Sequence, residues 1–125
     1  MPPAQAYGPR HQEVARDLSH IGSLLCDLHR LEEAADSFRE AHQLDATALG
    51  AEHVHTATDL GGFGLVLVAQ RRWREALPPL QQCQRVLQAS LEATHPHLQA
   101  VASALQKCAL EVALEAEKAH AGDNP

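Results

Sequence analysis

Three segments of this chain begin with histidine and align with one another: HQEVARDLSHIG (residues 11–22), HVHTATDLGGFG (residues 53–64) and HPHLQAVASALQ (residues 95–106). Each segment begins 42 residues after the one before it, and the first two share further identical residues in register. A period of this length indicates a solenoid of stacked units, in which each unit buries its apolar face against its neighbours. Solenoids usually present a surface to another macromolecule, so the repeat favours a binding function over catalysis.

The apolar residues of the first unit recur at helical spacing and predict two helices. The first stripe, at steps of three and four residues, consists of Val14, Leu18, Ile21, Leu25 and Leu28. The second stripe consists of Leu31, Ala34, Ala35, Phe38, Ala41, Leu44 and Leu49. We therefore expect helices over residues 9–28 and 31–48, joined by a tight turn at His29 and Arg30 without proline or glycine. Gly50 then ends the unit, where helices favour a glycine with a left-handed backbone.

The second unit follows the same plan, with helices expected over residues 54–70 and 73–91. The residues expected to point inward are Leu60, Phe63, Leu67, Val68, Trp73, Ala76, Leu77, Leu80, Cys83, Val86 and Leu87. Pro78 falls near the first turn of the second helix, but Pro79 lies deeper, where a proline costs about 3 kcal/mol. We therefore expect a kink or a late start in this helix.

The third unit matches the others only at its start. His95 and Pro96 open a helix, since proline suits the first turn. Apolar residues then continue at helical spacing, without a turn, at Leu98, Val101, Leu105, Cys108, Val112 and Leu114. We expect one capping helix over residues 96–119 that covers the apolar face of the preceding helix. The expected organisation is a flexible N-terminus (1–8), one domain (9–119) with repeats at about 9–50 and 53–92, and a disordered tail (120–125).

The composition indicates a single folded domain in a reducing compartment. The chain has 125 residues, of which 45% are hydrophobic, and this argues against disorder. Three cysteines, Cys26, Cys83 and Cys108, lack the spacing of a disulfide framework or a zinc site, so we expect buried, reduced thiols. The N-terminal segment lacks the apolar core of a signal peptide, and the longest apolar run (63–69) is too short to span a bilayer. We expect a cytoplasmic location without membrane insertion.

The charge pattern argues against nucleic acid as a partner. The net charge is −6, and no basic stripe exists beyond Arg71, Arg72 and Arg74. An acidic run in the first unit consists of Glu32, Glu33, Asp36 and Glu40. We interpret this run as a solvated helix face, with a surface for a basic partner as the alternative.

The histidine pairs could indicate a metal site, and the glycines could indicate a phosphate-binding loop. The rest of the sequence favours neither. The pairs His53/His55 and His95/His97 could hold a metal only from an extended loop, because residues two apart on a helix point to different sides. Their recurrence with the repeat favours a capping role, and we expect neither metal nor cofactor. The segment DLGGFG (59–64) lacks the lysine of a phosphate-binding loop.

Catalysis has little support, because no serine, histidine and acid form a motif of defined geometry. Gly61 and Gly62 are interpreted as residues that weaken their helix by about 1 kcal/mol each and leave the floor of a groove open. Close approach of a partner and tolerated drift explain them equally well.

The order of small and large residues in the first unit resembles the tetratricopeptide repeat (TPR). Small residues stand at Gly22, Ala34 and Ala41, and RLEEAADSFREAHQLDATALG (30–50) is the most specific match. The 42-residue period and the histidine at the start of each unit resemble the kinesin-light-chain type of this repeat. The resemblance covers about residues 9–119 and implies an all-α fold. The implied architecture is a right-handed α-solenoid of antiparallel helix pairs, with two TPR units and a long C-terminal capping helix. It also implies an adaptor whose first helices line a concave binding face.

The concave face of this family corresponds to three groups of residues in the chain. These are Arg16, Ser19, His20, Ser23, Cys26 and Asp27, then Thr58, Gly61, Gly62, Leu65 and Val68, then Ser103, Ala104 and Lys107. The asparagines with which kinesin-light-chain-type grooves hold a peptide are absent. Of the lysine clamp of chaperone-binding grooves, only Lys107 could serve. We expect a shallow, partly apolar floor suited to an apolar helix or a side-chain anchor. Leu65→Asp or Gly62→Arg should abolish binding without unfolding the helices.

The sequence therefore predicts a non-enzymatic protein-interaction module whose partner is a peptide or an amphipathic helix. One alternative is a structural module that self-associates through the ends of the solenoid as a homo-oligomer. Two and a half units fall short of the three usually needed for a stable stack, so a fragment of a longer array is a further alternative.

Overall fold

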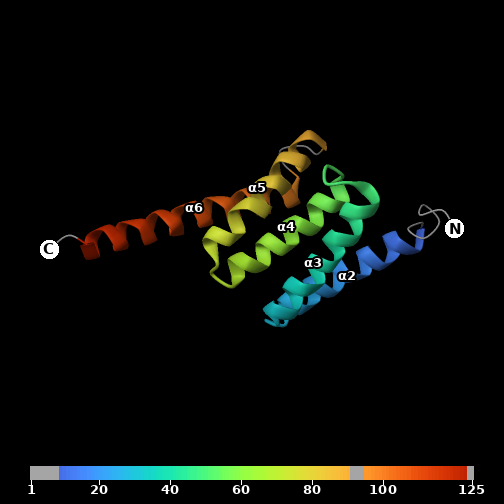
Figure 1. The fold of residues 1–125 in the computed structure, drawn as a ribbon, viewed down its shortest axis with the longest axis horizontal. Helices are drawn as coiled ribbons and strands as arrows, with labels where there is room; N and C mark the ends of the chain where they lie inside the picture. Colours follow the sequence, from blue (N-terminus) through green and yellow to red (C-terminus); the bar gives the residue numbers. More distant parts are fainter. Residues whose placement is uncertain (1–8, 91–94, 124–125) are drawn as a thin grey trace.

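The computed structural model describes residues 9–90 and 95–123. These residues form five helices: α2 (Pro9–Asp27), α3 (Leu31–Leu49), α4 (Val54–Ala69), α5 (Trp73–Ser90) and α6 (Pro96–Asp123). Each helix packs against the next one along the chain, and α4 also contacts α2 and α6 (Figure 1). The predicted all-α solenoid of helix pairs is confirmed.

The two turns between paired helices use the same backbone motif. At the end of α2, the His29 amide bonds to the Cys26 carbonyl at 3.0 Å and the Arg30 amide bonds to the Leu25 carbonyl at 2.8 Å. Forty-two residues later, the Arg71 and Arg72 amides bond to the Val68 and Leu67 carbonyls, both at 2.9 Å. This is the Schellman arrangement, which requires a left-handed residue after the helix. His29 (φ 60°) and Arg71 (φ 61°) fill that position without being glycine.

Gly50 and the prolines of α5 test two expectations about helix ends. Gly50 follows α3 with φ 92°, a backbone that favours glycine, as predicted. The expected late start of α5 is wrong, because the helix begins at Trp73 and continues through Pro78 and Pro79. Both prolines lie in the first two turns, where only a few carbonyls lose their amide partner.

Two histidines cap the helices that follow them. The His53 ring accepts a hydrogen bond from the His55 amide through Nδ1 at 3.1 Å, at the start of α4. The His95 ring accepts from the His97 amide at 3.2 Å in the same way, before α6. Each ring satisfies an amide that has no partner inside the helix. The recurrence of the His-x-His pairs therefore has a structural cause.

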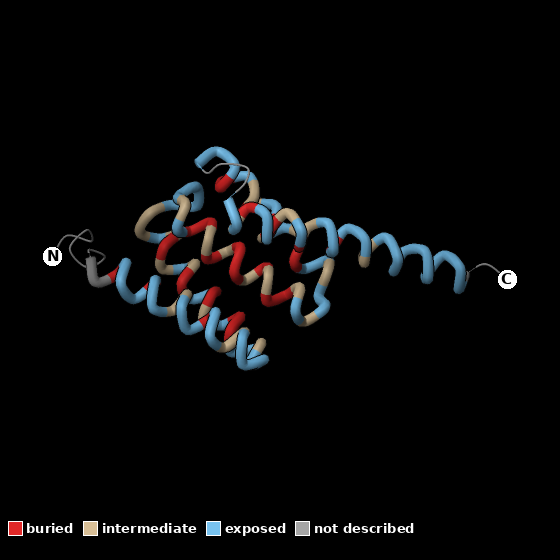
Figure 2. The backbone as a smooth tube through the Cα atoms, turned by 180° about the vertical axis from the view of Figure 1, so that it is seen from behind, coloured by how far each residue is buried: buried red, intermediate tan, exposed pale blue. Residues whose placement is uncertain are grey.

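The core consists of two clusters on either side of α4. The larger cluster joins α4, α5 and α6 and contains Ala57, Leu67, Ala76, Leu80, Cys83, Val86, Leu87, Leu98, Val101, Ala104 and Cys108. The smaller cluster joins α3 and α4 and contains Ala34, Ala35, Phe38 and Val66. Figure 2 shows buried backbone running through the middle of the molecule, with exposed helices at both ends. Phe63 on α4 packs against both clusters, so α4 connects the core of one unit to that of the next.

Glycines on α2 and α4 let neighbouring helices approach closely. A Cβ atom at Gly62 would lie 2.5 Å from the Phe38 ring, and one at Gly22 would lie 2.8 Å from the same ring. A Cβ atom at Gly61 would lie 2.5 Å from the Cys83 sulfur. These contacts are internal, so packing between helices explains the glycines without a partner or drift. A larger side chain at Gly62 would require the Phe38 ring to move, so we expect Gly62→Arg to disturb helix packing as well as the cavity.

The apolar stripe predicted for α2 is mostly exposed. Val14, Ile21 and Leu28 are 44%, 46% and 65% exposed, while Ala15 is buried. The buried residues of α2 are His11, Ala15 and Gly22 on the side that packs on α3 and α4, and no described helix covers the outer side. The sequence pattern predicted that these larger apolar residues point inward. The structure corrects this expectation, because they are exposed.

The capping helix is longer and less covered than expected. α6 continues to Asp123, so residues 120–123 are helical and do not form a disordered tail. Its first half packs on α5 and α4, but Leu110 and Leu114 are 56% and 40% exposed. Figure 1 shows the second half projecting beyond the other helices. The expected apolar cover therefore ends near the middle of α6.

Several expectations fall outside the described residues. The flexible N-terminus predicted over 1–8, the last residues of repeat 2 at 91–92 and the end of the tail at 124–125 are among these. No helix in the described ranges combines the length and the apolarity needed to cross a bilayer.

Candidate functional site

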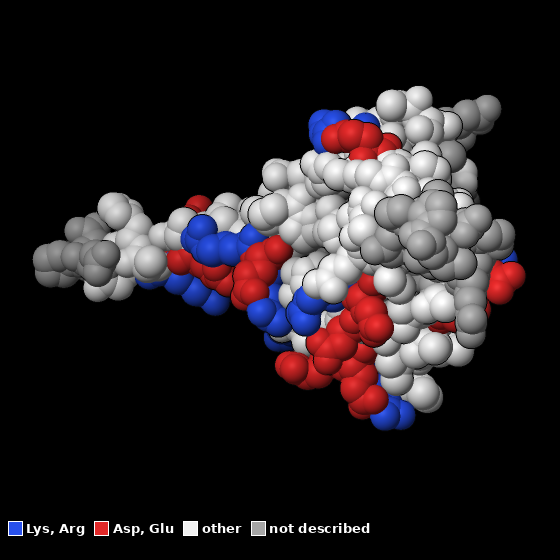
Figure 3. All heavy atoms as spheres, turned by 45° about the vertical axis from the view of Figure 1, so that its right-hand side comes forward, with Lys and Arg blue, Asp and Glu red and all other residues white. Residues whose placement is uncertain are grey.

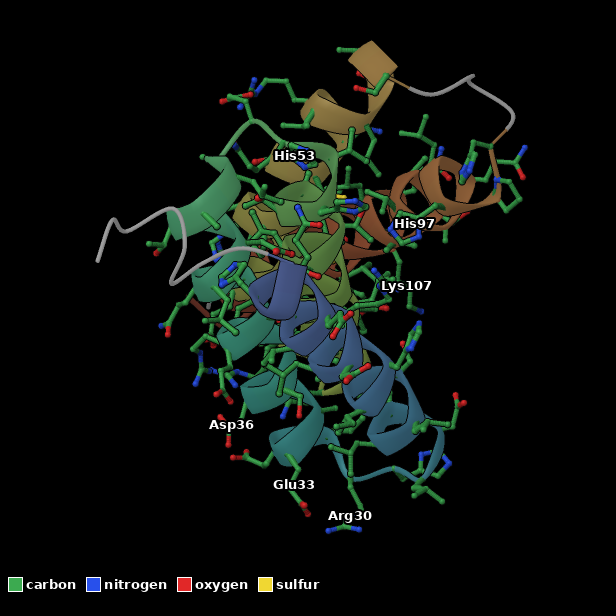
Figure 4. The ribbon with its side chains drawn as sticks, turned by 90° about the vertical axis from the view of Figure 1, so that its right-hand side faces the viewer. Arg30, Glu33, Asp36, His53, His97 and Lys107 are labelled. Carbon is green, nitrogen blue, oxygen red and sulfur yellow. The ribbon has the colours of Figure 1, made fainter. Side chains whose placement is uncertain are left out.

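A cavity of about 600 Å³ opens beside α2, and residues of α2, α3, α4 and α6 line it. α2 forms one side through its polar face, and α4 forms the floor. His97, at the start of α6, closes one end of the cavity. In the view of Figure 4, His97 and Lys107 both lie on the side of α6 next to α2, but only His97 lines the cavity. The walls of the cavity therefore come from both units and from the capping helix.

The structure brings together most of the concave-face residues predicted for the first two units. The cavity-lining residues among them are Arg16, Ser19, His20, Ser23, Cys26, Asp27, Thr58, Gly62 and Leu65. The predicted residues outside the lining are Gly61, Val68, Ser103, Ala104 and Lys107. The predicted face is thus confined to α2 and α4, with α6 contributing a residue, His97, that was not predicted.

The residues outside the lining have other contacts. Gly61 faces Cys83 on α5, and Ala104 is buried in the larger core cluster. Lys107 lies 5.8 Å from the centre of the Trp73 ring, and its Nζ lies 3.3 Å from Glu111 Oε1. The possible lysine clamp is therefore directed away from the cavity. This corrects the expectation for Lys107, because the register of α6 turns this side chain toward α5.

Two buried carboxyl groups form the deepest part of the cavity. Asp45 on α3 and Asp59 on α4 are each only 4% exposed, and both line the cavity. The Ser19 hydroxyl on α2 donates a hydrogen bond of 2.5 Å to Asp59 Oδ1. His11 Nε2 lies 3.8 Å from Asp45 Oδ1. Three helices therefore meet at a polar cluster in which two acids lie side by side.

The two acids perturb each other. Burial, and then the hydrogen bond with Asp45, raise the pKa of Asp59 from 3.8 to about 8, although the Ser19 hydroxyl acts in the opposite direction. Two carboxyl groups can share a hydrogen bond only when one of them is protonated. The raised pKa therefore favours the protonated form of Asp59 at neutral pH, which can donate this hydrogen bond to Asp45.

The His97 ring and the Cys26 thiol beside the cavity have shifted pKa values that favour their neutral forms. Burial lowers the pKa of His97, and the neighbouring His95 lowers it further. Burial and Asp27 raise the pKa of the Cys26 thiol, and Cys26 is only half-buried, contrary to expectation. Burial also raises the pKa of Cys83 to about 11, which matches the inert, buried thiol predicted there. The described residues contain no cluster of three or more potential metal ligands.

Sequence reasoning missed the acids at the centre of the cavity. Asp45 lies seven residues after Phe38, on the buried side of α3, where an apolar residue is expected. Asp59 entered the sequence analysis only as the first residue of DLGGFG; Asp17 occupies the equivalent position 42 residues earlier. A charged residue at a core position of the stripe is a signal for such a site. His55 and His97 also line the cavity and were considered only as capping or metal-binding residues.

The acidic run on α3 lies away from the cavity, on the surface. Glu32, Glu33, Asp36 and Glu40 are all exposed. Glu33 pairs with Arg30 at 2.6 Å and Asp36 pairs with Arg39 at 3.1 Å. Acidic side chains gather next to basic ones on this part of the surface (Figure 3). The structure thus agrees with a solvated face.

Comparison with known proteins agrees with the helix pairs. A family model described as tetratricopeptide repeat matches residues 13–89, which is more than half of the chain. A search of curated proteins finds no significant match. The matched range contains both helix pairs and both Schellman turns. The chain therefore belongs to the tetratricopeptide repeat family.

Proposed function

We propose that this protein is a non-enzymatic adaptor that binds a protein partner in the cavity beside α2. Tetratricopeptide repeats generally mediate protein–protein interactions. The observation that supports the cavity as the binding surface is its lining, which combines exposed polar residues on α2 with partly apolar residues on α4. Such a surface suits a peptide or the face of an amphipathic helix.

Two finer features belong to the same proposal. The 42-residue period and the capping histidines are consistent with the kinesin-light-chain type of the repeat. Three free cysteines, two of them buried, are consistent with a cytoplasmic location.

The proposal is tested by affinity capture of partners on the full chain, with quantification by mass spectrometry. Leu65→Asp places a charge on the cavity floor, and Ser23→Tyr fills the cavity from an exposed position on α2. Leu110→Asp is the matched control, because Leu110 is 56% exposed on α6 and outside the lining. Both cavity variants should lose the partners that the wild type and the control retain. If folded cavity variants, checked by circular dichroism, retain every partner, the cavity is not the binding surface.

Self-association is the second candidate function, and the exposed apolar side of α2 favours it. Val14, Ile21 and Leu24 on this helix, and Leu28 directly after it, are all at least 44% exposed. Large exposed apolar side chains that follow one helix face suit another helix. Light scattering on the purified chain tests this candidate. A dimer that becomes a monomer in the Ile21→Glu/Leu28→Glu variant would support it, and a monomer at all concentrations would reject it.

A further inference from the structure

The buried pair of acids is not required by the packing of the repeat. Asp45 and Asp59 correspond, 42 residues later, to Leu87 and Val101, which are fully buried in the larger core cluster. The same helix junction therefore forms with apolar residues. Replacing buried charged groups by apolar ones of similar size is often neutral or stabilising. The first junction thus contains a costly pair of acids where the second does not.

One oxygen of the buried pair lacks a hydrogen-bond donor. Asp59 Oδ2 is fully buried and receives no hydrogen bond from an N–H or O–H group of the described residues. The other oxygen of this carboxyl group, Oδ1, already accepts from Ser19. The side-chain hydrogen bond between Asp59 and Asp45 needs a proton, so without that proton only an external cation can satisfy Asp59 Oδ2. The buried oxygen is therefore a second observation, besides the acidic charge, that points to a ligand.

The surroundings of the pair favour a positive ligand. The titratable or basic groups that face the pair or line the cavity are His11, Arg16 and His20 on α2, His42 on α3, His55 on α4 and His97 on α6. Only Arg16 is permanently charged, and it is exposed on α2. Asp27 adds a third carboxyl group to the lining. Burial lowers the pKa of His42 and His97, so these rings do not supply the missing charge at neutral pH.

We infer that Asp45 and Asp59 form a subsite for an arginine side chain of the protein partner, and this inference rests on the proposed function. A guanidinium group has several donors in one plane and can bond two carboxylate oxygens at once. It is also more weakly hydrated than an ammonium group, so its burial costs less. Phe38, Leu65 and Val66 line the cavity and provide apolar contact for the aliphatic part of the side chain.

Arginine binding at this subsite exchanges a cation for a proton. The free protein holds a proton between the two carboxyl groups, and the guanidinium group displaces it to solvent. The pKa of Asp59 of about 8 sets the range of this exchange. Below pH 8 the ligand competes with a bound proton, so affinity should rise with pH and level off above 8.

The probe is N-acetyl-arginine amide, with the uncharged N-acetyl-citrulline amide as its control. Carbon-13 NMR of the Asp59 carboxyl group in the full chain reports binding at pH 6.5 and pH 8.5. The arginine probe should shift this resonance, with an affinity roughly tenfold or more higher at pH 8.5. The citrulline probe should have no effect. Calorimetry in two buffers of different ionisation enthalpy should detect release of a proton at pH 6.5.

Two variants with the same chemical change locate the subsite. Asp59→Asn should lose binding of the arginine probe, followed through the amide resonances of α2 and α4. Asp17→Asn is the matched control, because Asp17 occupies the same repeat position on α2 but is exposed and outside the cavity lining. It should bind as the wild type does. Asp45→Asn gives a second test of the subsite if Asp59→Asn proves unstable by thermal melting.

The outcomes separate the subsite from the proposed function. No response of Asp59 to the arginine probe at either pH, or an equal response to citrulline, overturns the subsite. If partner capture still depends on Leu65 and Ser23 in that case, the adaptor proposal stands alone. If the probe binds at Asp59 but both cavity variants retain every partner, the subsite exists and the adaptor proposal fails.

Discussion

The two junctions between successive units have equivalent positions but opposite chemistry. At the first junction, Ser19, Asp45 and Asp59 meet in a polar cluster on α2, α3 and α4. The equivalent residues on α4, α5 and α6 are Gly61, Leu87 and Val101, all buried. The apolar junction closes the end of the core, whereas the polar one lies beneath an open cavity. The repeat thus fixes where the helices meet, while the residues at the meeting point decide whether the junction is apolar or polar.

An acidic residue introduced at the apolar junction should destabilise the chain strongly. Leu87→Asp places a single carboxyl group in a fully buried apolar site and also removes core packing. We expect a loss of about 4 kcal/mol in the free energy of unfolding, measured by urea denaturation. Leu110→Asp, on an exposed part of α6, should change stability by less than about 0.5 kcal/mol. A similar small loss at Leu87 would mean that α6 is not held by this junction.

Apolar residues introduced at the polar junction should stabilise the chain. The double variant Asp45→Leu/Asp59→Val introduces the residues found 42 positions later. We expect a gain on the order of 2 kcal/mol at pH 8 in urea denaturation, because two buried acids are replaced by apolar contacts. Ser19, which loses its acceptor, can bond to a carbonyl of its own helix. A variant less stable than the wild type at this pH would show that the polar cluster holds α2 in place.

A single neutral substitution should remove the pH dependence of the polar junction. The pKa of Asp59 is 3.8 before folding and about 8 in the folded chain, so the folded state binds the proton more tightly. The stability that this proton contributes is complete below about pH 4 and is lost as the pH rises to about 8. Asp59→Asn imitates the protonated acid and donates permanently to Asp45. It should gain on the order of 1 kcal/mol at pH 8 and little at pH 4.

Urea midpoints measured at several pH values provide this comparison. The wild-type midpoint should decrease between pH 4 and pH 8 more steeply than that of Asp59→Asn. Asp17→Asn, at the exposed equivalent position, should follow the wild type. Parallel curves for the wild type and Asp59→Asn would contradict the shared proton.

Glycine substitutions in the turns before the two junctions should change the stability of the chain by equal amounts. His29 and Arg71 both have positive φ, at about 60°. Replacement by glycine should stabilise the chain by about 0.5–1 kcal/mol at each site, because glycine adopts this backbone without strain. Gly50→Ala should have the opposite sign, since Gly50 has φ 92°. Thermal melting of the three variants checks these signs, and a loss at either turn would show that the side chain there stabilises the structure.

The repeat explains how much of this structure could be predicted from the sequence. Periodic apolar residues and the 42-residue offset located all five helices, and the recurrence of His53 and His95 indicated their capping role. The same periodicity misjudged α2, because apolar spacing does not reveal whether a neighbouring helix is present to cover it. Val14 and Leu28 are therefore exposed although they belong to a regular stripe.

The centre of the cavity was harder to predict because it departs from the repeat. Asp45 interrupts an apolar stripe, and its significance depends on Asp59, which lies on the next helix and comes close to Asp45 only when α3 and α4 pack together. His97 reaches the cavity from a helix that matches the repeat only at its start. Predicting the α2 side of the surface required only the family register, but the buried acids required the tertiary structure.

Direct titration of the Asp59 carboxyl group by carbon-13 NMR, from pH 3 to pH 10 in the free wild-type chain, tests the central claim. The account predicts a midpoint near pH 8, because burial and Asp45 hold a proton at the floor of the cavity. A midpoint near 4, the value of an unperturbed aspartate, would show that Asp59 is fully ionised at neutral pH. That result would contradict the shared proton and the proton release expected when arginine binds.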